Sequence, residues 1–315
     1  MSSIRDVEKN LKRKLDTAMS LQRTPDSLSK LEDFLQKNVM LSQIKEDFHG
    51  ETEELRRLQQ ENLIVKWALT YVDQHPCAEM KEIAEPVRAI IWKCAGVKCD
   101  DYQKLHIGQW VRFFNPTNIT LVTGGHVIYF AGGRSVTFLD GRGKILIFGP
   151  ADFASGVKIF THDHNVGDPE KPSYSQGRVV FPSIIFPDCF IGEDVHIFGD
   201  LQLKTVVADF SVTSLKKNYP PYSIVGGIGG TYRVIRHLNF PQIFPPKYLE
   251  DLLENAKKSL PEAREFLKEY FGVIKKLIET KGEREQVWSY LLQDVKRIKE
   301  KYGMVEKEES GGNAV

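Results

Sequence analysis

The sequence predicts a mainly β core, built as a parallel β-helix, with α-helical regions on both sides of it. Three observations lead to this fold class. Apolar residues recur at helical spacing in the first hundred residues and again after residue 241. The stretch between them is rich in Val, Ile, Phe and Gly, and Gly-Gly and Asp-Gly turns divide it into short segments. Within that stretch, aliphatic residues recur every six positions.

The composition changes along the chain predict three regions. Residues 1–100 form a helical N-terminal region, 101–240 the β-helix, and 241–315 a helical C-terminal region with a disordered tail. The boundary after 240 follows from Pro241, Pro245 and Pro246, which separate the strands from the last helices.

Helical spacing predicts four helices in the first region. They cover 4–19, 27–39, 51–73 and a segment after Pro76. Thr24-Pro25-Asp26 separates the first two helices. Pro86 is expected to kink the fourth helix or to start it afresh, because proline lacks the amide hydrogen that a helix interior needs.

The middle region contains short candidate strands. They are too short and too closely spaced for strand–helix–strand units, so the sequence does not predict a doubly wound sheet. The candidate strands are Trp110–Phe114, Ile119–Val122, His126–Phe130, Ser135–Leu139 and Lys144–Phe148.

The six-residue period predicts that these strands stack as the coils of a β-helix. In a β-helix of hexapeptides, six residues form one flat face and three faces close one coil. One aliphatic side chain per face then points into the tube, and stacked coils bury a continuous core. On spacing alone, a β-sandwich remains the alternative. The aliphatic positions are Ile147, Phe153 and Ile159, then Val179, Ile185, Ile191, Ile197 and Leu203, with Val195, Leu201 and Val207 in a second register.

The overall composition is that of a globular chain. Its 315 residues carry 43 Lys and Arg against 42 Asp and Glu, a formal net charge of +1, which argues against nucleic acid as a partner. No apolar stretch is long enough for a transmembrane segment, and the first twenty residues do not resemble a signal peptide. Four cysteines without a CxxC pair then predict a cytoplasmic location.

Three segments resemble the hexapeptide-repeat acyltransferases, in particular the maltose, galactoside and polysaccharide O-acetyltransferases. They are FGPADFASGVKIFTHDH (148–164), IGEDVHI (191–197) and YPPYSIVGG (219–227), which YRVIR (232–236) follows. The resemblance covers about 144–236 and implies that the β-helix is left-handed. It also implies acetyl-CoA as co-substrate, no metal, and a homotrimer, because the family binds CoA in a groove between subunits.

The resemblance also implies the reaction. A histidine general base removes a proton from a sugar or polysaccharide hydroxyl, or an amine, which then attacks the thioester of acetyl-CoA directly. His164 has the spacing of the family's catalytic histidine, five residues after Ile159. His162 is expected to bind the acceptor or to take the catalytic role itself. Asp163 or Asp168 is expected to orient one of the two imidazoles.

The donor site follows from the same resemblance. Lys217 matches the family's lysine before the Pro-Pro turn, and Lys216 is a plausible addition. Arg233 and Arg236 match two arginines after the last coil, and all four cations would bind phosphate. Gly226 and Gly227 would let the backbone approach the pantetheine closely.

Two other functions fit the same fold. One is a zinc enzyme of the gamma carbonic anhydrase type, with ligands drawn from His126, His162, His164 and His196. The other is a non-catalytic scaffold whose β-helix only trimerises. Binding of CoA would favour the acyltransferase, and bound zinc would favour the anhydrase.

Overall fold

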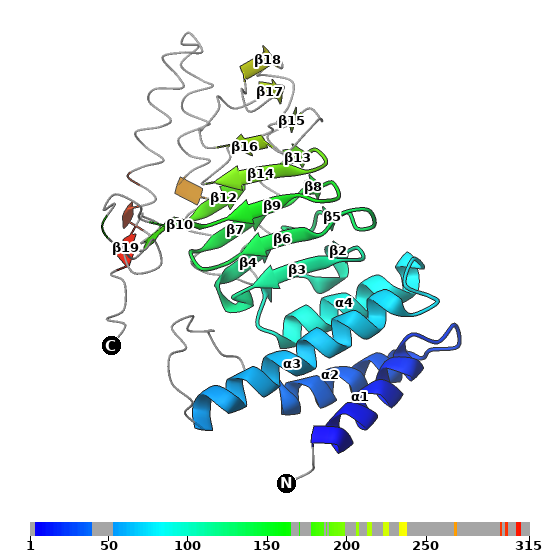
Figure 1. Ribbon diagram of the computed structural model, residues 1–315. Coiled ribbons are helices and arrows are strands. Elements are labelled where there is room, and N and C mark those ends of the chain that lie inside the picture. The colour runs from blue at the N-terminus through cyan, green and yellow to red at the C-terminus, as the bar shows by residue number, and fades with distance from the viewer. Residues whose placement is uncertain are drawn as a thin grey trace.

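The computed structural model shows a helical unit at one end of a column of stacked β-strands (Figure 1). The structure describes residues 4–39, 53–164, 170, 178–185, 187, 189–198, 206–207, 213–215, 223–226, 233–237, 268–269, 297, 300–301 and 307–309. Among these residues, no helix is long and apolar enough to cross a membrane. The helices expected after residue 241 lie outside the described residues, apart from five isolated helical positions.

The helical unit agrees closely with the sequence pattern. Its elements are α1 (Ile4–Ala18), α2 (Pro25–Asn38), α3 (Glu53–Gln74) and α4 (Lys81–Cys94). α4 packs against α2, α3 and the first strands of the column. Pro86 lies inside α4 without starting a new helix, because Ala84 and Val87 on either side of it are completely buried and hold the segment in place.

Three parallel sheets form the column, and successive strands of each coil belong to sheets A, B and C in that order. Sheet A contains β1 (Lys98–Cys99), β4 (Ile119–Val122), β7 (Ile145–Phe148) and β12 (Ser183–Ile185). Sheet B contains β2 (Leu105–Ile107), β5 (Ile128–Phe130), β8 (Ala151–Phe153), β13 (Cys189–Ile191), β15 (Val206–Val207) and β17 (Ser223–Gly226), with β18 (Arg233–His237) antiparallel at its end. Sheet C contains β3 (Val111–Phe114), β6 (Thr137–Asp140), β9 (Lys158–Phe160), β14 (Val195–Phe198) and β16 (Thr213–Leu215).

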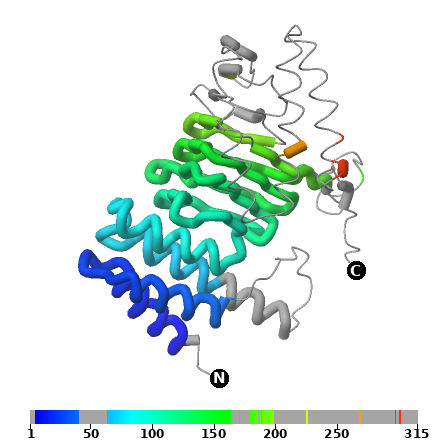
Figure 2. The backbone as a smooth tube through the Cα atoms, turned by 180° about the vertical axis from the view of Figure 1, so that it is seen from behind, coloured from blue at the N-terminus to red at the C-terminus, as the bar shows by residue number. Residues whose placement is uncertain are grey.

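This topology is a parallel β-helix, so the predicted fold class of the core is confirmed. In Figure 1 the strands of sheet C run from right to left across the near face while the coils rise away from α4, which makes the β-helix left-handed. Figure 2 shows the same stack of coils from behind, with the helical unit at its N-terminal end.

The strand register explains the six-residue period. Ile147, Phe153 and Ile159 lie on sheets A, B and C of one coil, and each pairs with Ile185, Ile191 or Ile197 of the next coil. All six side chains are at most 1% exposed. The period therefore marks the interior of the tube, as predicted. Val179 is different, because it lies in a strand outside the coil.

An earlier coil shows why the period cannot be followed further towards the N-terminus. Its inward residues Leu121, Phe130 and Leu139 are completely buried but stand nine positions apart, because longer turns connect β4, β5 and β6. Phe130 still stacks on Phe153 of the next coil, with ring centroids 4.8 Å apart. The coils thus share one core despite different turn lengths.

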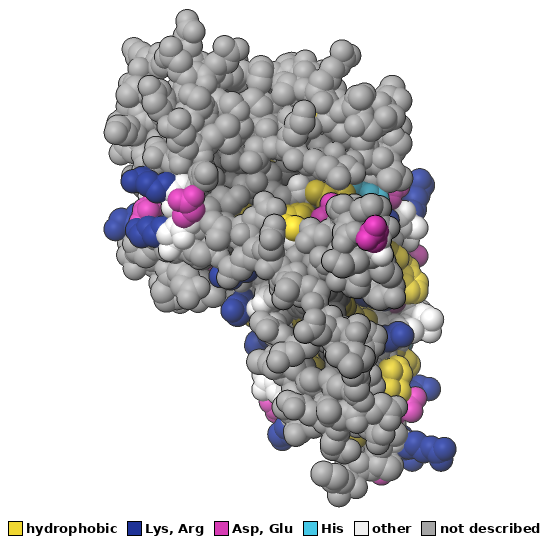
Figure 3. Space-filling model, turned by 60° about the vertical axis from the view of Figure 1, so that its left-hand side comes forward, with side chains coloured by type: hydrophobic (Ala, Val, Ile, Leu, Met, Phe, Trp, Pro, Cys, Tyr) yellow, Lys and Arg dark blue, Asp and Glu magenta, His cyan; other side chains and the backbone are white. Residues whose placement is uncertain are grey.

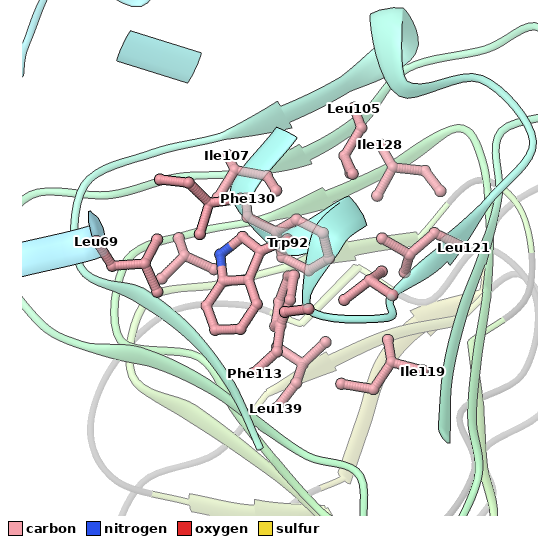
Figure 4. Packing of buried hydrophobic residues seen from close by; sticks show 14 of the residues in the cluster. Leu69, Trp92, Leu105, Ile107, Phe113, Ile119, Leu121, Ile128, Phe130 and Leu139 are labelled. Carbon is pink, nitrogen blue, oxygen red and sulfur yellow. The ribbon is translucent and has the colours of Figure 1, made fainter. Parts of the chain in front are cut away.

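Helix α4 closes the N-terminal end of the tube with Trp92, which is 3% exposed and lies 4.7 Å from Phe113 between ring centroids (Figure 4). Beside it, Arg88 of α4 forms an ion pair of 2.9 Å with Asp73 of α3. The same carboxylate accepts a hydrogen bond of 2.7 Å from Arg112 of β3. Buried charges need such partners, and here the partners join the helices to the first coil.

A hairpin interrupts the column between β9 and β12. It consists of β10 (His162–His164) and β11 (Arg178–Val180), which pair antiparallel. A third strand, β19 (Lys307–Glu309), pairs antiparallel with β11. It lies in the tail that the sequence predicts to be disordered.

Candidate functional site

The β10–β11 hairpin brings both candidate histidines to the side of the β-helix. The chain leaves the coil after Phe160 and rejoins it at Ser183. In the register, His162 is opposite Val180 and His164 is opposite Arg178. Residues two apart on a strand share a face, so the predicted relation between the two histidines agrees with the backbone. The side chain of His164 lies outside the described part of the chain.

The imidazole of His162 is bound to Asp140. Its Nδ1 lies 2.8 Å from Asp140 Oδ2, and the two side chains are 12% and 2% exposed. Asp140 is the last residue of β6, which places its carboxylate where the chain turns out of the coil. The backbone amide of Arg142 donates to the other carboxylate oxygen over 3.2 Å. These hydrogen bonds compensate for burying the carboxylate.

Arg142 completes the cluster. Its Nη1 lies 3.3 Å from Asp140 Oδ2 and also contacts both ring nitrogens of His162. A carboxylate only accepts and a guanidinium only donates. The tautomer in which Nδ1 donates to Asp140 and Nε2 accepts from Arg142 satisfies both partners. Both ring nitrogens are thus in contact with these two neighbours.

The turn below the cluster is held by backbone contacts. The Thr161 hydroxyl donates to the Asp140 carbonyl over 2.5 Å and accepts from the Gly143 amide over 2.7 Å. A Cβ at Gly143 would meet the Phe181 carbonyl oxygen at 2.4 Å. Only glycine fits at this position, because Thr161 at the start of the hairpin and Phe181 at its end both lie against Gly143.

The sequence pattern does not indicate Asp140 or Arg142 as site residues. It predicts Asp163 or Asp168 as the orienting carboxylate, whereas the structure pairs His162 with Asp140. Asp163 is exposed, and Asp168 lies outside the described residues. The sequence predicts only a turn at Asp140-Gly141, because the 22 positions that separate Asp140 from His162 leave no local pattern.

The candidate donor-site residues are described only in part. Lys216, Lys217 and Gly227 lie outside the described residues. Gly226 ends β17, and Arg233 is its register partner at the start of β18. Arg236 is opposite Ile224 in the same pair of strands. The backbone thus places Gly226 opposite Arg233.

The outer face of sheet C continues from the hairpin as an aromatic surface. Phe160 stacks on Phe198 with ring centroids 5.0 Å apart. The rings of Phe160 and His196 pack in a T-shaped arrangement with their centroids 5.9 Å apart. Burial lowers the pKa of His196, and the positive charge of Lys158 lowers it further, whereas Asp194 raises it. His196 is therefore held in its neutral form beside an apolar surface.

Other reactive groups can be assessed among the described residues. Burial raises the pKa of Cys94 and of Cys99 to about 12, so neither thiol provides a thiolate nucleophile at neutral pH. No three described His, Cys, Asp or Glu side chains gather into a group that could hold a metal ion. On the face in Figure 3, the described Lys and Arg side chains are interspersed with Asp and Glu and form no single basic patch.

No protein-family model matches the sequence, and no curated protein matches it. Among solved structures, the chain is similar to a hexapeptide-repeat-containing acetyltransferase from Vibrio cholerae complexed with acetyl coenzyme A. The two are 18% identical, 65% of this chain and 98% of that chain are covered, and the TM-score is 0.42. A galactoside acetyltransferase in complex with coenzyme A is 19% identical, with 60% and 86% covered and a TM-score of 0.44. A maltose O-acetyltransferase from Clostridium difficile is 18% identical, with 57% and 88% covered and a TM-score of 0.42. Likenesses of this size assign neither an activity nor a ligand to this chain.

Proposed function

We propose that this protein is an acyltransferase that moves the acetyl group of acetyl-CoA to a hydroxyl, or an amine, of a sugar or polysaccharide. The observation that carries the proposal is the His162–His164 hairpin, which is fixed to a β-helix coil by a buried aspartate. Direct transfer needs a positioned base and no covalent enzyme intermediate. The raised thiol pKa values of Cys94 and Cys99 are consistent with such a mechanism.

In the proposed reaction, His164 takes the proton from the acceptor hydroxyl as its oxygen attacks the thioester carbonyl carbon. The new carbon–oxygen bond gives a tetrahedral oxyanion, which backbone amides near the hairpin would stabilise. Its collapse breaks the carbon–sulfur bond, and the departing CoA thiolate receives the proton from the imidazolium. Imidazole suits both steps because it exchanges a proton near neutral pH.

His162 has a different role in this proposal. Asp140 and Arg142 use both of its ring nitrogens, so no lone pair is left to accept the acceptor's proton. His162 therefore positions the hairpin, and Asp163 is left as an exposed neighbour of the base. This assignment separates two histidines that the sequence alone leaves interchangeable.

Acetyl-CoA would bind at the C-terminal coils. Lys216, Lys217, Arg233 and Arg236 would hold its phosphates, while Gly226 and Gly227 would pass close to the pantetheine. The antiparallel pairing of β17 with β18 supports this donor site, because it places Gly226 opposite Arg233. A homotrimer would complete each groove with a neighbouring subunit, and a cytoplasmic location would supply acetyl-CoA.

The test combines calorimetry with a transfer assay. We expect wild-type protein and His164→Ala to bind acetyl-CoA with affinities within a few-fold, whereas His164→Ala loses transfer by at least about 100-fold. His126→Ala, which removes a histidine from a turn before β5, should leave transfer unchanged.

Three results would contradict the proposal. Unchanged turnover in His164→Ala removes this residue from the mechanism. Bound zinc with carbonic anhydrase activity supports the metalloenzyme instead. No binding at millimolar acetyl-CoA, with no zinc, leaves the scaffold.

A further inference from the structure

The hairpin that carries His164 has little support of its own. It is a two-stranded insertion, and an isolated pair of strands is only marginally stable in water. On the β10 edge, His162 is held by Asp140 and Arg142. A general base must nevertheless be held within a fraction of an ångström of its productive position. The other edge of the hairpin therefore needs a partner as well.

Strand β19 supplies that partner. All three of its residues pair with β11, which becomes the central strand of a three-stranded sheet in the order β10, β11, β19. Added strands of this kind bind through main-chain hydrogen bonds and need few side-chain contacts. Residues 307–309 are in this way joined to an insertion in the middle of the β-helix.

The register across the three strands has a consequence for the base. His164 is opposite Arg178, and Arg178 is opposite Glu309, so these three positions form one row. Directly opposed residues of an antiparallel pair share a face, and opposite charges there are stabilising. Glu308, which is opposite Val179, belongs to the neighbouring row on the other face.

We propose that strand β19 of the C-terminal tail is part of the catalytic unit, and that Glu309 positions His164 through Arg178. This inference rests on the proposed acyl transfer. The hairpin is then held from both edges, by Asp140 and Arg142 at β10 and by the tail at β11. Glu309 acts as a positioning residue that does not touch the substrate.

A charge exchange in the full-length protein tests the row. Glu309→Arg places two cations opposite each other, and we expect kcat to fall about tenfold while KM for acetyl-CoA stays within about twofold. Combining Glu309→Arg with Arg178→Glu restores opposite charges and should recover most of kcat. Glu308→Arg makes the same change of charge one residue away, on the other face, and should have no effect. Equal losses in Glu308→Arg and Glu309→Arg, or no recovery in the double variant, would overturn the role of Glu309.

A second experiment tests the strand pairing without relying on activity. Combining Glu308→Pro with Glu309→Pro removes two adjacent amides, one of which faces β11 because amide directions alternate along a strand. Hydrogen exchange of the amides among 178–180 that face β19 should then accelerate at least about tenfold relative to the wild-type chain. Combining Gly311→Pro with Gly312→Pro, just beyond β19, provides the matched control and should leave exchange unchanged.

The two readouts separate the possible failures. A wild-type chain that neither binds nor turns over acetyl-CoA overturns the proposed function, while the exchange experiment still decides whether β19 pairs with β11. Unchanged exchange in the 308–309 proline variant overturns the pairing. Faster exchange with unchanged kcat shows that the tail pairs with the hairpin but is not part of the catalytic unit, and this also overturns the inference.

Discussion

Two buried aspartates in this molecule each bind two cationic or basic side chains, but they do so in different parts of the fold. Asp73 lies between Arg88 and Arg112 where the helical unit meets the first coil, and the Asp73 and Arg88 side chains are at most 2% exposed. Asp140 lies between Arg142 and His162 at the hairpin, where these two partners are 24% and 12% exposed. At Asp73 both partners are permanently charged, and the buried Asp73–Arg88 pair stabilises the junction of the helices with the first coil. At Asp140 one partner is the imidazole of His162, so this cluster holds the hairpin that carries His164 in the proposed mechanism.

The largest effect should come from breaking the first cluster. Asp73→Ala leaves the charge of Arg88 buried without its partner, and we expect the free energy of unfolding to fall by about 3–5 kcal/mol. Urea denaturation measures this loss. The exposed pair of Lys30 and Asp26 serves as the control, because Asp26→Ala should cost at most about 1 kcal/mol. Similar losses at the two sites would show that the buried cluster has no special role.

Changing the second cluster should affect activity more than stability. Asp140→Asn keeps the shape of the side chain but weakens its hold on His162, and we expect kcat to fall about 100-fold through misplacement of the hairpin. The midpoint of urea denaturation should move much less than in Asp73→Ala. A variant that loses stability and retains its kcat would reverse the comparison and make Asp140 a structural residue.

The smallest predicted effect concerns pH. The pKa of His196 is lowered in the folded state, so the unfolded chain binds more protons between the folded pKa and the ordinary value of 6.5. Its contribution to stability is complete above about pH 6.5 and is lost as the pH falls towards the folded pKa. His196→Gln should therefore make the unfolding free energy depend less steeply on pH between about pH 7 and pH 5. An unchanged slope would show that His196 is not desolvated in the folded protein.

The sequence predicted the fold because its strongest signal depends on geometry. Where turns are short, six residues make one face, and the spacing of Ile147, Phe153 and Ile159 reports the interior directly. Where turns are longer, as between Leu121 and Phe130, the inward side chains are equally buried but their spacing in the sequence changes. Val179 kept the period and yet lies in the hairpin, because spacing alone does not show whether a strand belongs to a coil.

The site could be predicted only as far as it is local in sequence. His162 and His164 stand two residues apart, and the strand pattern places them on one face. Asp140 reaches His162 only because one coil of the β-helix returns the chain to the same place. The pairing of β19 with β11 joins still more distant segments. Contacts of this kind depend on coil length and register, which no short motif encodes.

The closure of the tube by α4 also determines how far the β-helix extends. Strands β1, β2 and β3 are the first members of their sheets, and such edges can pair with any other open strand. Trp92 fills the opening, and Arg88 donates a hydrogen bond to the carbonyl of Ile107 on β2, which occupies part of that edge. The helical unit therefore covers the strand edges on which a second column could otherwise stack end to end.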